Sequence, residues 1–94
     1  MGKLVRDGIP AMVGAGAVAR VLDADEYAAA LHAKLKEEVT EYLEAHDPEE
    51  LADVLEVLHA LAALHGLTPQ ELEAKWAAKV QARGGFGGRV WMEF

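Results

Sequence analysis

Two acidic helical stretches, separated by a short break at residues 46–48, constrain this chain more than any other feature. The first stretch carries Glu38 and Glu41, and the second carries Glu50 and Asp53. The members of each pair are three positions apart, which places them on one face of an α-helix. A break of this length joins two antiparallel helices. The sequence therefore predicts a helical hairpin in which the two acidic pairs face each other.

Capping residues and apolar periodicity predict three main helices. Each begins after an Asp or Thr that can accept hydrogen bonds from free backbone N–H groups; for the first helix this residue is Asp23 or Asp25. The second and third helices start with proline, which suits the first helical position. Gly66 and the pair at residues 84–85 are the expected stop signals. The predicted helices span residues 24–45, 48–65 and 69–83.

Both ends of the chain are predicted to lack long helices. Residues 1–23 are rich in turn signals, with one helical turn expected over residues 11–15. Residues 17–22 and 89–94 have strand-like patterns and can pair as a small ribbon, although an isolated hairpin is marginal in water. The expected fold class is all-α: one domain over residues 1–94, built as a bundle of about three main helices with a short terminal β-ribbon.

The composition narrows the classes of partner. Hydrophobic residues make up 52% of the chain and aromatic residues only 6%, so its short helices carry more than one apolar stripe and self-association is expected. A net charge of −7 argues against a nucleic-acid partner, which requires a basic face. The absence of cysteine excludes disulfides and thiolate metal sites. No apolar run has the length of a membrane span, so a soluble, cytoplasmic protein without a membrane partner is expected.

The helical phase of Glu38 favours a metal site. Counted from Leu31 in steps of about 100°, Glu38 lies about 20° away, inside the apolar arc, and Glu41 about 80° away, on its flank. A carboxylate in an apolar stripe is costly unless a cation compensates it. Oxygen ligands from two facing helices suit Mg²⁺, with Mn²⁺ as a substitute. The alternative interpretation is that the acids are ordinary solvent-facing helix residues. By spacing alone, this is how we interpret Glu37, Glu44, Glu49, Glu56 and Glu73.

Basic residues near the C-terminus and near the N-terminus are candidate phosphate contacts. Lys79 and Arg83 lie one helical turn apart and precede a Gly-rich loop, and the arginine guanidinium can bind phosphate oxygens in pairs. Lys3, Arg6 and Arg89 join them if the chain ends fold over the acidic residues. The alternative for Lys79 and Arg83 is a helix C-terminus that carries favourable cations. Beside an acidic metal site, phosphate binding is the preferred interpretation.

The acidic motif and both chain ends resemble a known superfamily. The sequence EEVTE at residues 37–41, followed by ELADV at residues 50–54, is similar to the EExxE…ExxD signature of the all-α nucleoside-triphosphate pyrophosphohydrolases. Residues 3–10 and 83–86 resemble the start and end of a small MazG-like subgroup often labelled phosphoribosyl-ATP pyrophosphohydrolase-like. The resemblance spans essentially the whole chain, with Gly8 at a position where the subgroup usually has lysine.

The resemblance implies a Mg²⁺-dependent hydrolase that cleaves the α–β phosphoanhydride of a nucleotide into a monophosphate and pyrophosphate. It implies a homodimer or homotetramer, phosphate contacts from Lys79 and Arg83, and a house-cleaning role on non-canonical nucleotides. Two alternatives stay open: hydrolysis of phosphoribosyl-ATP in histidine biosynthesis, and a helical binding module without turnover. The implied catalytic set is Glu37, which supports the others or orients water, together with the metal ligands Glu38, Glu41, Glu50 and Asp53.

Overall fold

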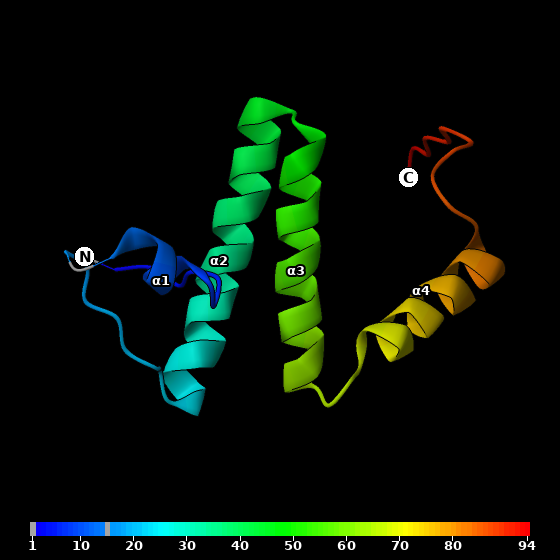
Figure 1. The fold of residues 1–94 in the computed structure, drawn as a ribbon. Coiled ribbons are helices and arrows are strands. Elements are labelled where there is room, and N and C mark those ends of the chain that lie inside the picture. The colour runs from blue at the N-terminus through cyan, green and yellow to red at the C-terminus, as the bar shows by residue number, and fades with distance from the viewer. Residues whose placement is uncertain (1, 15) are drawn as a thin grey trace.

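A computed structural model describes residues 2–14 and 16–94, and every regular element in those two ranges is a helix. The hairpin of α2 (Ala24–Ala45) and α3 (Pro48–Leu64) forms the centre of the molecule, and α4 (Pro69–Arg83) leaves from the end of α3 (Figure 1). The prediction of an all-α fold with three main helices is confirmed. The predicted turn over residues 11–15 lies partly outside the described residues, because Ala15 is not among them. The helices are α1 (Ile9–Val13), α2 (Ala24–Ala45), α3 (Pro48–Leu64) and α4 (Pro69–Arg83).

Helix α2 begins and ends through local backbone chemistry. The Asp23 side chain accepts a hydrogen bond from the backbone N–H of Glu26 at 2.8 Å, and the Glu26 carboxylate accepts one from the Asp23 N–H at 3.2 Å. This reciprocal pair is a capping box, and it identifies Asp23 rather than Asp25 as the N-cap. At the other end His46 adopts a left-handed conformation with φ of 55°, which stops the helix and starts the turn into α3.

Helices α3 and α4 follow the predicted capping pattern. Asp47 caps α3 by accepting a hydrogen bond at 3.0 Å from the backbone N–H two residues ahead. Thr68 and Glu71 form a second capping box at the start of α4, with both hydrogen bonds at 3.1 Å. Gly66 and Gly84 follow α3 and α4 with φ of 77° and 79°, a region in which glycine is not strained. The three main helices therefore begin and end for local reasons.

The hydrophobic core of the single chain is small and lies between α2 and α3. Among the described hydrophobic residues, those that are buried are Leu31, Val57 and Ala62. Helix α2 packs along α3, whereas α4 contacts α3 alone among the helices. Helices α1 and α4 lie on opposite sides of the hairpin (Figure 1). The radius of gyration is 16.7 Å, against about 12 Å for a compact domain of this length, so the chain is open in shape.

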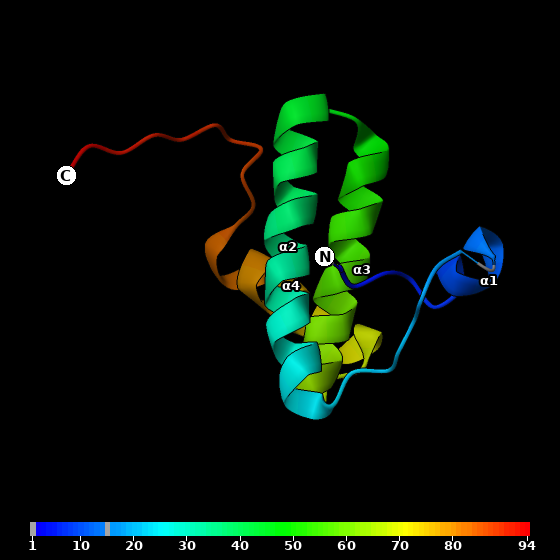
Figure 2. The same ribbon diagram turned by 90° about the vertical axis from the view of Figure 1, so that its left-hand side faces the viewer.

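The predicted terminal ribbon is not formed within the single chain. Residues 17–22 and 89–94 are irregular, and neither of the two described ranges of the chain contains a strand. The two segments lie on opposite sides of the α2–α3 hairpin (Figures 1 and 2). An alternating pattern becomes a strand only when a neighbouring strand pairs with its backbone groups, and here the two ends do not meet. Val90, Trp91 and Phe94 stay exposed as a result.

No single helix in the described ranges combines the length and the apolar composition that crossing a membrane requires. The helices α3 and α4 meet that test only when they are taken together, and they are bent by 103° at the break between them. Both carry charged side chains, among them Asp53 on α3 and Lys79 on α4.

The ion pair at the start of α2 generates a prediction about pH. The hydrogen bond from Arg20, at 2.9 Å, and the one from the Asp23 N–H lower the pKa of Glu26 from 4.5 to about 2. Because this pKa is lower in the folded chain, the stabilisation is complete above about pH 4.5 and is lost as the pH falls toward 2. In Glu26→Gln, the amide keeps an acceptor for the Asp23 N–H but has no charge for Arg20.

We therefore expect the melting temperature of Glu26→Gln to be lower than that of the wild type at neutral pH. The difference should shrink towards zero near pH 2, and circular dichroism melts across this range would measure it. A difference that is the same at both ends of the range would show that the charge of Glu26 does not stabilise α2.

Candidate metal centre

Glu38 is the centre of the acidic cluster. Its side chain lies between α2 and α3 and is 6% exposed, and no other charged residue in the described ranges is buried. Its Oε1 atom accepts an ion-pair contact from Lys34 Nζ at 3.1 Å. Its Oε2 atom is buried and has no hydrogen-bond partner among the described residues. A buried acceptor without a partner costs about 1–3 kcal/mol, and more when it is charged, so this oxygen is suited to a cation.

The acidic residues of the two helices meet around Glu38. Ligand oxygens of Glu38, Glu50 and Asp53 lie within 4.8 Å of one another, and those of Glu37, Glu38 and Glu41 do the same. Glu38 belongs to both groups, so α2 and α3 bring together the residues that the sequence predicts as ligands. The four predicted ligands do not form one group, because Glu41 lies with Glu37 and Glu38. Of the first predicted pair, Glu38 lies with Glu50 and Asp53 of the facing helix, whereas Glu41 is outside that group.

Burial and crowding affect the carboxylates beside Glu38. Desolvation raises the pKa of Glu50, and the charge of Asp53 raises it further. Desolvation also raises the pKa of Glu41, with a smaller contribution from Glu38. The Oε2 atom of Glu50 is a second buried oxygen without a hydrogen-bond partner in the described part of the chain. All candidate metal ligands in the cluster are carboxylate oxygens. Hard divalent cations such as Mg²⁺ prefer oxygen ligands, so the residues fit such an ion.

Lys34 is a cluster residue that the sequence analysis missed. Its Nζ atom lies 3.2 Å from Glu37 Oε2 as well as 3.1 Å from Glu38 Oε1, and its side chain is 17% exposed. Burial works to lower the pKa of Lys34, but the hydrogen bonds to Glu38 and Glu37 outweigh it and the pKa is raised. Desolvation likewise works to raise the pKa of Glu37, but Lys34 and Lys3 hold it below its usual value. The sequence contained a signal for these contacts, because Lys34 lies three residues before Glu37 and four before Glu38.

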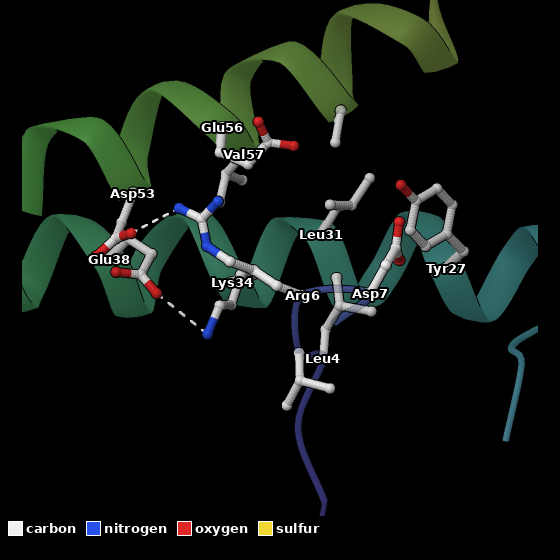
Figure 3. Close-up of a pocket in the computed structure, with 12 residues that line it drawn as sticks. Leu4, Arg6, Asp7, Tyr27, Leu31, Lys34, Glu38, Asp53, Glu56 and Val57 are labelled. Carbon is white, nitrogen blue, oxygen red and sulfur yellow. Dashed lines mark hydrogen bonds and ion pairs between the residues drawn. The ribbon is translucent and has the colours of Figure 1, made fainter. Parts of the chain in front are cut away.

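The N-terminal segment folds over the cluster, as the phosphate-binding prediction for its cations required. Arg6 Nη2 lies 2.6 Å from Asp53 Oδ1, and Lys3 Nζ lies 3.5 Å from Glu37 Oε1. The hydrogen bond to Asp53 raises the pKa of Arg6. Figure 3 shows the guanidinium of Arg6 extended along the cluster and the ion pair of Lys34 with Glu38 beside it. The acidic cluster is therefore paired with basic side chains from the same chain.

A cavity of about 350 Å³ adjoins the cluster. The N-terminal segment at residues 4–7 forms one wall, and side chains of α2 and α3 form the other (Figure 3). Glu38 and Asp53 lie at one end of this cavity, and Tyr27 lies at the other. The carboxylates of Glu38 and Asp53 are thus reached from a cavity that also has apolar walls.

Lys79 and Arg83 are not brought to the acidic residues within the single chain. Both side chains are exposed on α4, which contacts only α3 among the helices. No residue of α4 lines the cavity beside Glu38. Their predicted role therefore depends on a contact that one chain alone does not make.

Comparison with known proteins leaves the site to be interpreted from its own chemistry. No protein-family model, no curated protein and no solved structure matches the chain. The burial, the spacing and the charges of the cluster are the observations that remain.

The buried oxygens generate a prediction about metal binding. We expect Mg²⁺ or Mn²⁺ to raise the melting temperature, because the ion binds only the folded chain. At a concentration 100 times Kd the stabilisation is about 2.7 kcal/mol, which corresponds to roughly 10–20 °C for a domain of this size. Differential scanning fluorimetry in EDTA and in each metal would measure it.

Glu38→Gln is expected to lose the metal-dependent rise in melting temperature. The substitution removes the charge of the one residue that belongs to both sets of acids. The matched control is Glu44→Gln, an exposed residue of α2 outside both groups, which should keep the rise. An equal rise in Glu38→Gln and in the control would contradict the assignment of the cluster as a metal site.

Proposed function

We propose that this chain is a Mg²⁺-dependent nucleotide pyrophosphohydrolase, with Mn²⁺ as a substitute. The observation that carries the proposal is Glu38, which is buried between two helices with one oxygen unpartnered and with Glu50 and Asp53 within 4.8 Å. Mg²⁺ in proteins is held by a few carboxylates and keeps positions for water and substrate phosphates. The resemblance of residues 37–41 and 50–54 to the EExxE…ExxD signature supports the same reaction.

The cluster offers distinct chemical roles to its members. When bound, Mg²⁺ would neutralise the phosphates and lower the pKa of a coordinated water. Glu38, Glu50 and Asp53 would hold the ion. Water attacks one phosphorus of the α–β anhydride, the bridging P–O bond breaks, and a nucleoside monophosphate and pyrophosphate separate. Glu41 would accept the proton of the water, because it lies beside Glu38 but outside the group with Glu50 and Asp53, whereas Glu37 is paired with Lys34 and Lys3.

The cations of the N-terminal segment gain a second role in this proposal. Arg6 pairs with Asp53 at 2.6 Å through a side chain that is 55% exposed, so it can turn without a change in the fold. A divalent ion on Asp53 would compete with the guanidinium. The released Arg6 could then bind a phosphate of the substrate, where its planar donors suit two oxygens at once. Lys3, which now contacts Glu37, is placed to act in the same way.

The reaction is tested by pyrophosphate release from a panel of canonical and modified nucleoside triphosphates and phosphoribosyl-ATP. We expect release with Mg²⁺ and none with EDTA. Glu38→Gln should lower kcat by at least about 100-fold, the order found when a group that stabilises transition-state charge is removed. Glu44→Gln serves as the exposed control and should retain activity.

The best substrate would also separate the proposed house-cleaning of non-canonical nucleotides in the cytoplasm from hydrolysis of phosphoribosyl-ATP. Folded protein that releases pyrophosphate from no member of the panel would overturn the hydrolase. A binding module without turnover would then be the better interpretation.

We also infer that the chain works as a homodimer or homotetramer. Its accessible surface is 8204 Å², against roughly 5,300 Å² for a compact monomer of this mass. Much of the excess is apolar: Leu55 on α3 is 50% exposed and Trp76 on α4 is 61% exposed, beside each other along one groove. A second copy would cover this surface, and its α4 could bring Lys79 and Arg83 to the acidic cluster.

The oligomer is tested by sedimentation equilibrium at micromolar concentration, where we expect the mass of two or four chains. Leu55→Glu should shift the protein towards the monomer, because it places a charge on the apolar groove. Lys36→Gln changes the net charge by the same amount at an exposed polar position of α2 and should not. A wild-type protein that is monomeric at this concentration would contradict the inference.

A further inference from the structure

We propose that the cavity beside the acidic cluster binds the nucleoside half of the substrate and selects bases that carry an amino group over uracil and thymine. This inference rests on the proposed function, because the metal site sets which end of the cavity receives phosphate. It adds the chemical class of the base, which neither the acidic motif nor the metal determines.

The cavity has the size and the polarity of a site for a nucleoside. Its volume of about 350 Å³ falls in the range of roughly 300–1,000 Å³ usual for ligand pockets. Glu38 and Asp53 mark the phosphate end, while Tyr27 and Asp7 mark the opposite end (Figure 3). A nucleotide whose phosphates lie at the acidic cluster therefore extends its sugar and base between the N-terminal segment and the helices.

The middle of the cavity is walled by apolar side chains. Leu31 and Val57 are 3% and 6% exposed, so their positions are held by the packing of α2 on α3. Leu4 lies across the cavity from them, and the ring of Tyr27 closes the far end (Figure 3). A planar base can pack against aliphatic walls and against the face or edge of an aromatic ring. This part of the cavity holds a base without selecting one.

Selection comes from the carboxylates around the apolar walls. The Asp7 carboxylate lies beside the Tyr27 ring at the far end, and Glu56 reaches the cavity from α3 (Figure 3). Asp7 makes no ion pair with any described residue. Ionised carboxylates accept hydrogen bonds and cannot donate them. The far end of the cavity therefore favours a ligand edge that donates.

The natural bases differ in this respect. Cytosine and adenine carry an exocyclic amino group, and guanine presents an amino and an imino N–H side by side. Uracil and thymine present one N–H between two carbonyl oxygens, which a carboxylate repels. Asp7 thus distinguishes cytosine from uracil, two bases of the same size. Asp7 could instead accept a hydrogen bond from a sugar hydroxyl. That contact would give no preference between cytosine and uracil.

The test measures binding of non-hydrolysable α,β-imido analogues of CTP and UTP by calorimetry with Mg²⁺, using the full chain. Inorganic triphosphate is the probe without a nucleoside. We expect the CTP analogue to bind roughly fivefold more tightly than the UTP analogue, the ratio that one net hydrogen bond produces. Asp7→Asn, which offers a donor as well as an acceptor, should bring this ratio close to one. Asp25→Asn is the control outside the cavity and should keep it.

A second variant tests the place of the nucleoside. Ala60 lines the cavity on α3, and Ala60→Leu would fill part of the space. It should weaken both analogues by at least about tenfold and leave the affinity for inorganic triphosphate unchanged. Equal affinities of the two analogues in the wild type would overturn the proposal. It would also be overturned by a ratio that Asp7→Asn leaves unchanged, or by an Asp7→Asn effect equal on both analogues.

The binding measurements and the pyrophosphate assay distinguish failure of the base selection from failure of the proposed hydrolase. Analogue binding with an Asp7-dependent ratio, but with no pyrophosphate released from CTP, would reject the hydrolase and keep the nucleoside site. Release from CTP and UTP at equal efficiency, unchanged by Asp7→Asn and Ala60→Leu, would keep the hydrolase and reject the selection proposed here.

Discussion

The rest of the structure depends on the burial of one carboxylate between two helices. Glu38 lies on the same face of α2 as the buried Leu31, two helical turns further along, and only one of its oxygens has a partner. Lys34 compensates part of the charge from the same helix. Glu50 and Asp53 add negative charge from the facing helix, so the hairpin gathers carboxylates around the one that is buried. Hairpin packing and the acidic cluster are therefore linked, because the same helix contact creates both.

The N-terminal segment connects this cluster to the rest of the proposed site. It has little regular structure of its own, yet Lys3 and Arg6 hold it against the acids of both helices. The same segment forms one wall of the cavity that adjoins the cluster. Ion pairs at exposed positions are individually weak and exchangeable. A segment held in this way could stay in place in the proposed exchange, in which Arg6 leaves a carboxylate for a phosphate.

The open shape of the chain has the same physical origin as its small core. Two helices bury one stripe each, and 94 residues arranged as a hairpin with one diverging helix leave the remaining apolar stripes uncovered. The second copy proposed above would cover these stripes. Leu55, Trp76 and the C-terminal Trp91 are exposed for this reason.

The sequence by itself determined the three main helices and the acidic face, because caps, proline positions and helical phase act within a few residues of one another. Helical phase predicted Glu38 in the apolar arc, and the structure buries it there. The predicted end of the second helix was one residue beyond the observed end at Leu64. Only the tertiary structure decided which cations from outside α2 meet the acids. The pairing of Arg6 with Asp53 and the distance of Lys79 from the cluster depend on where the N-terminal segment and α4 lie relative to the hairpin. Those positions result from contacts between distant parts of the chain, which no local spacing encodes.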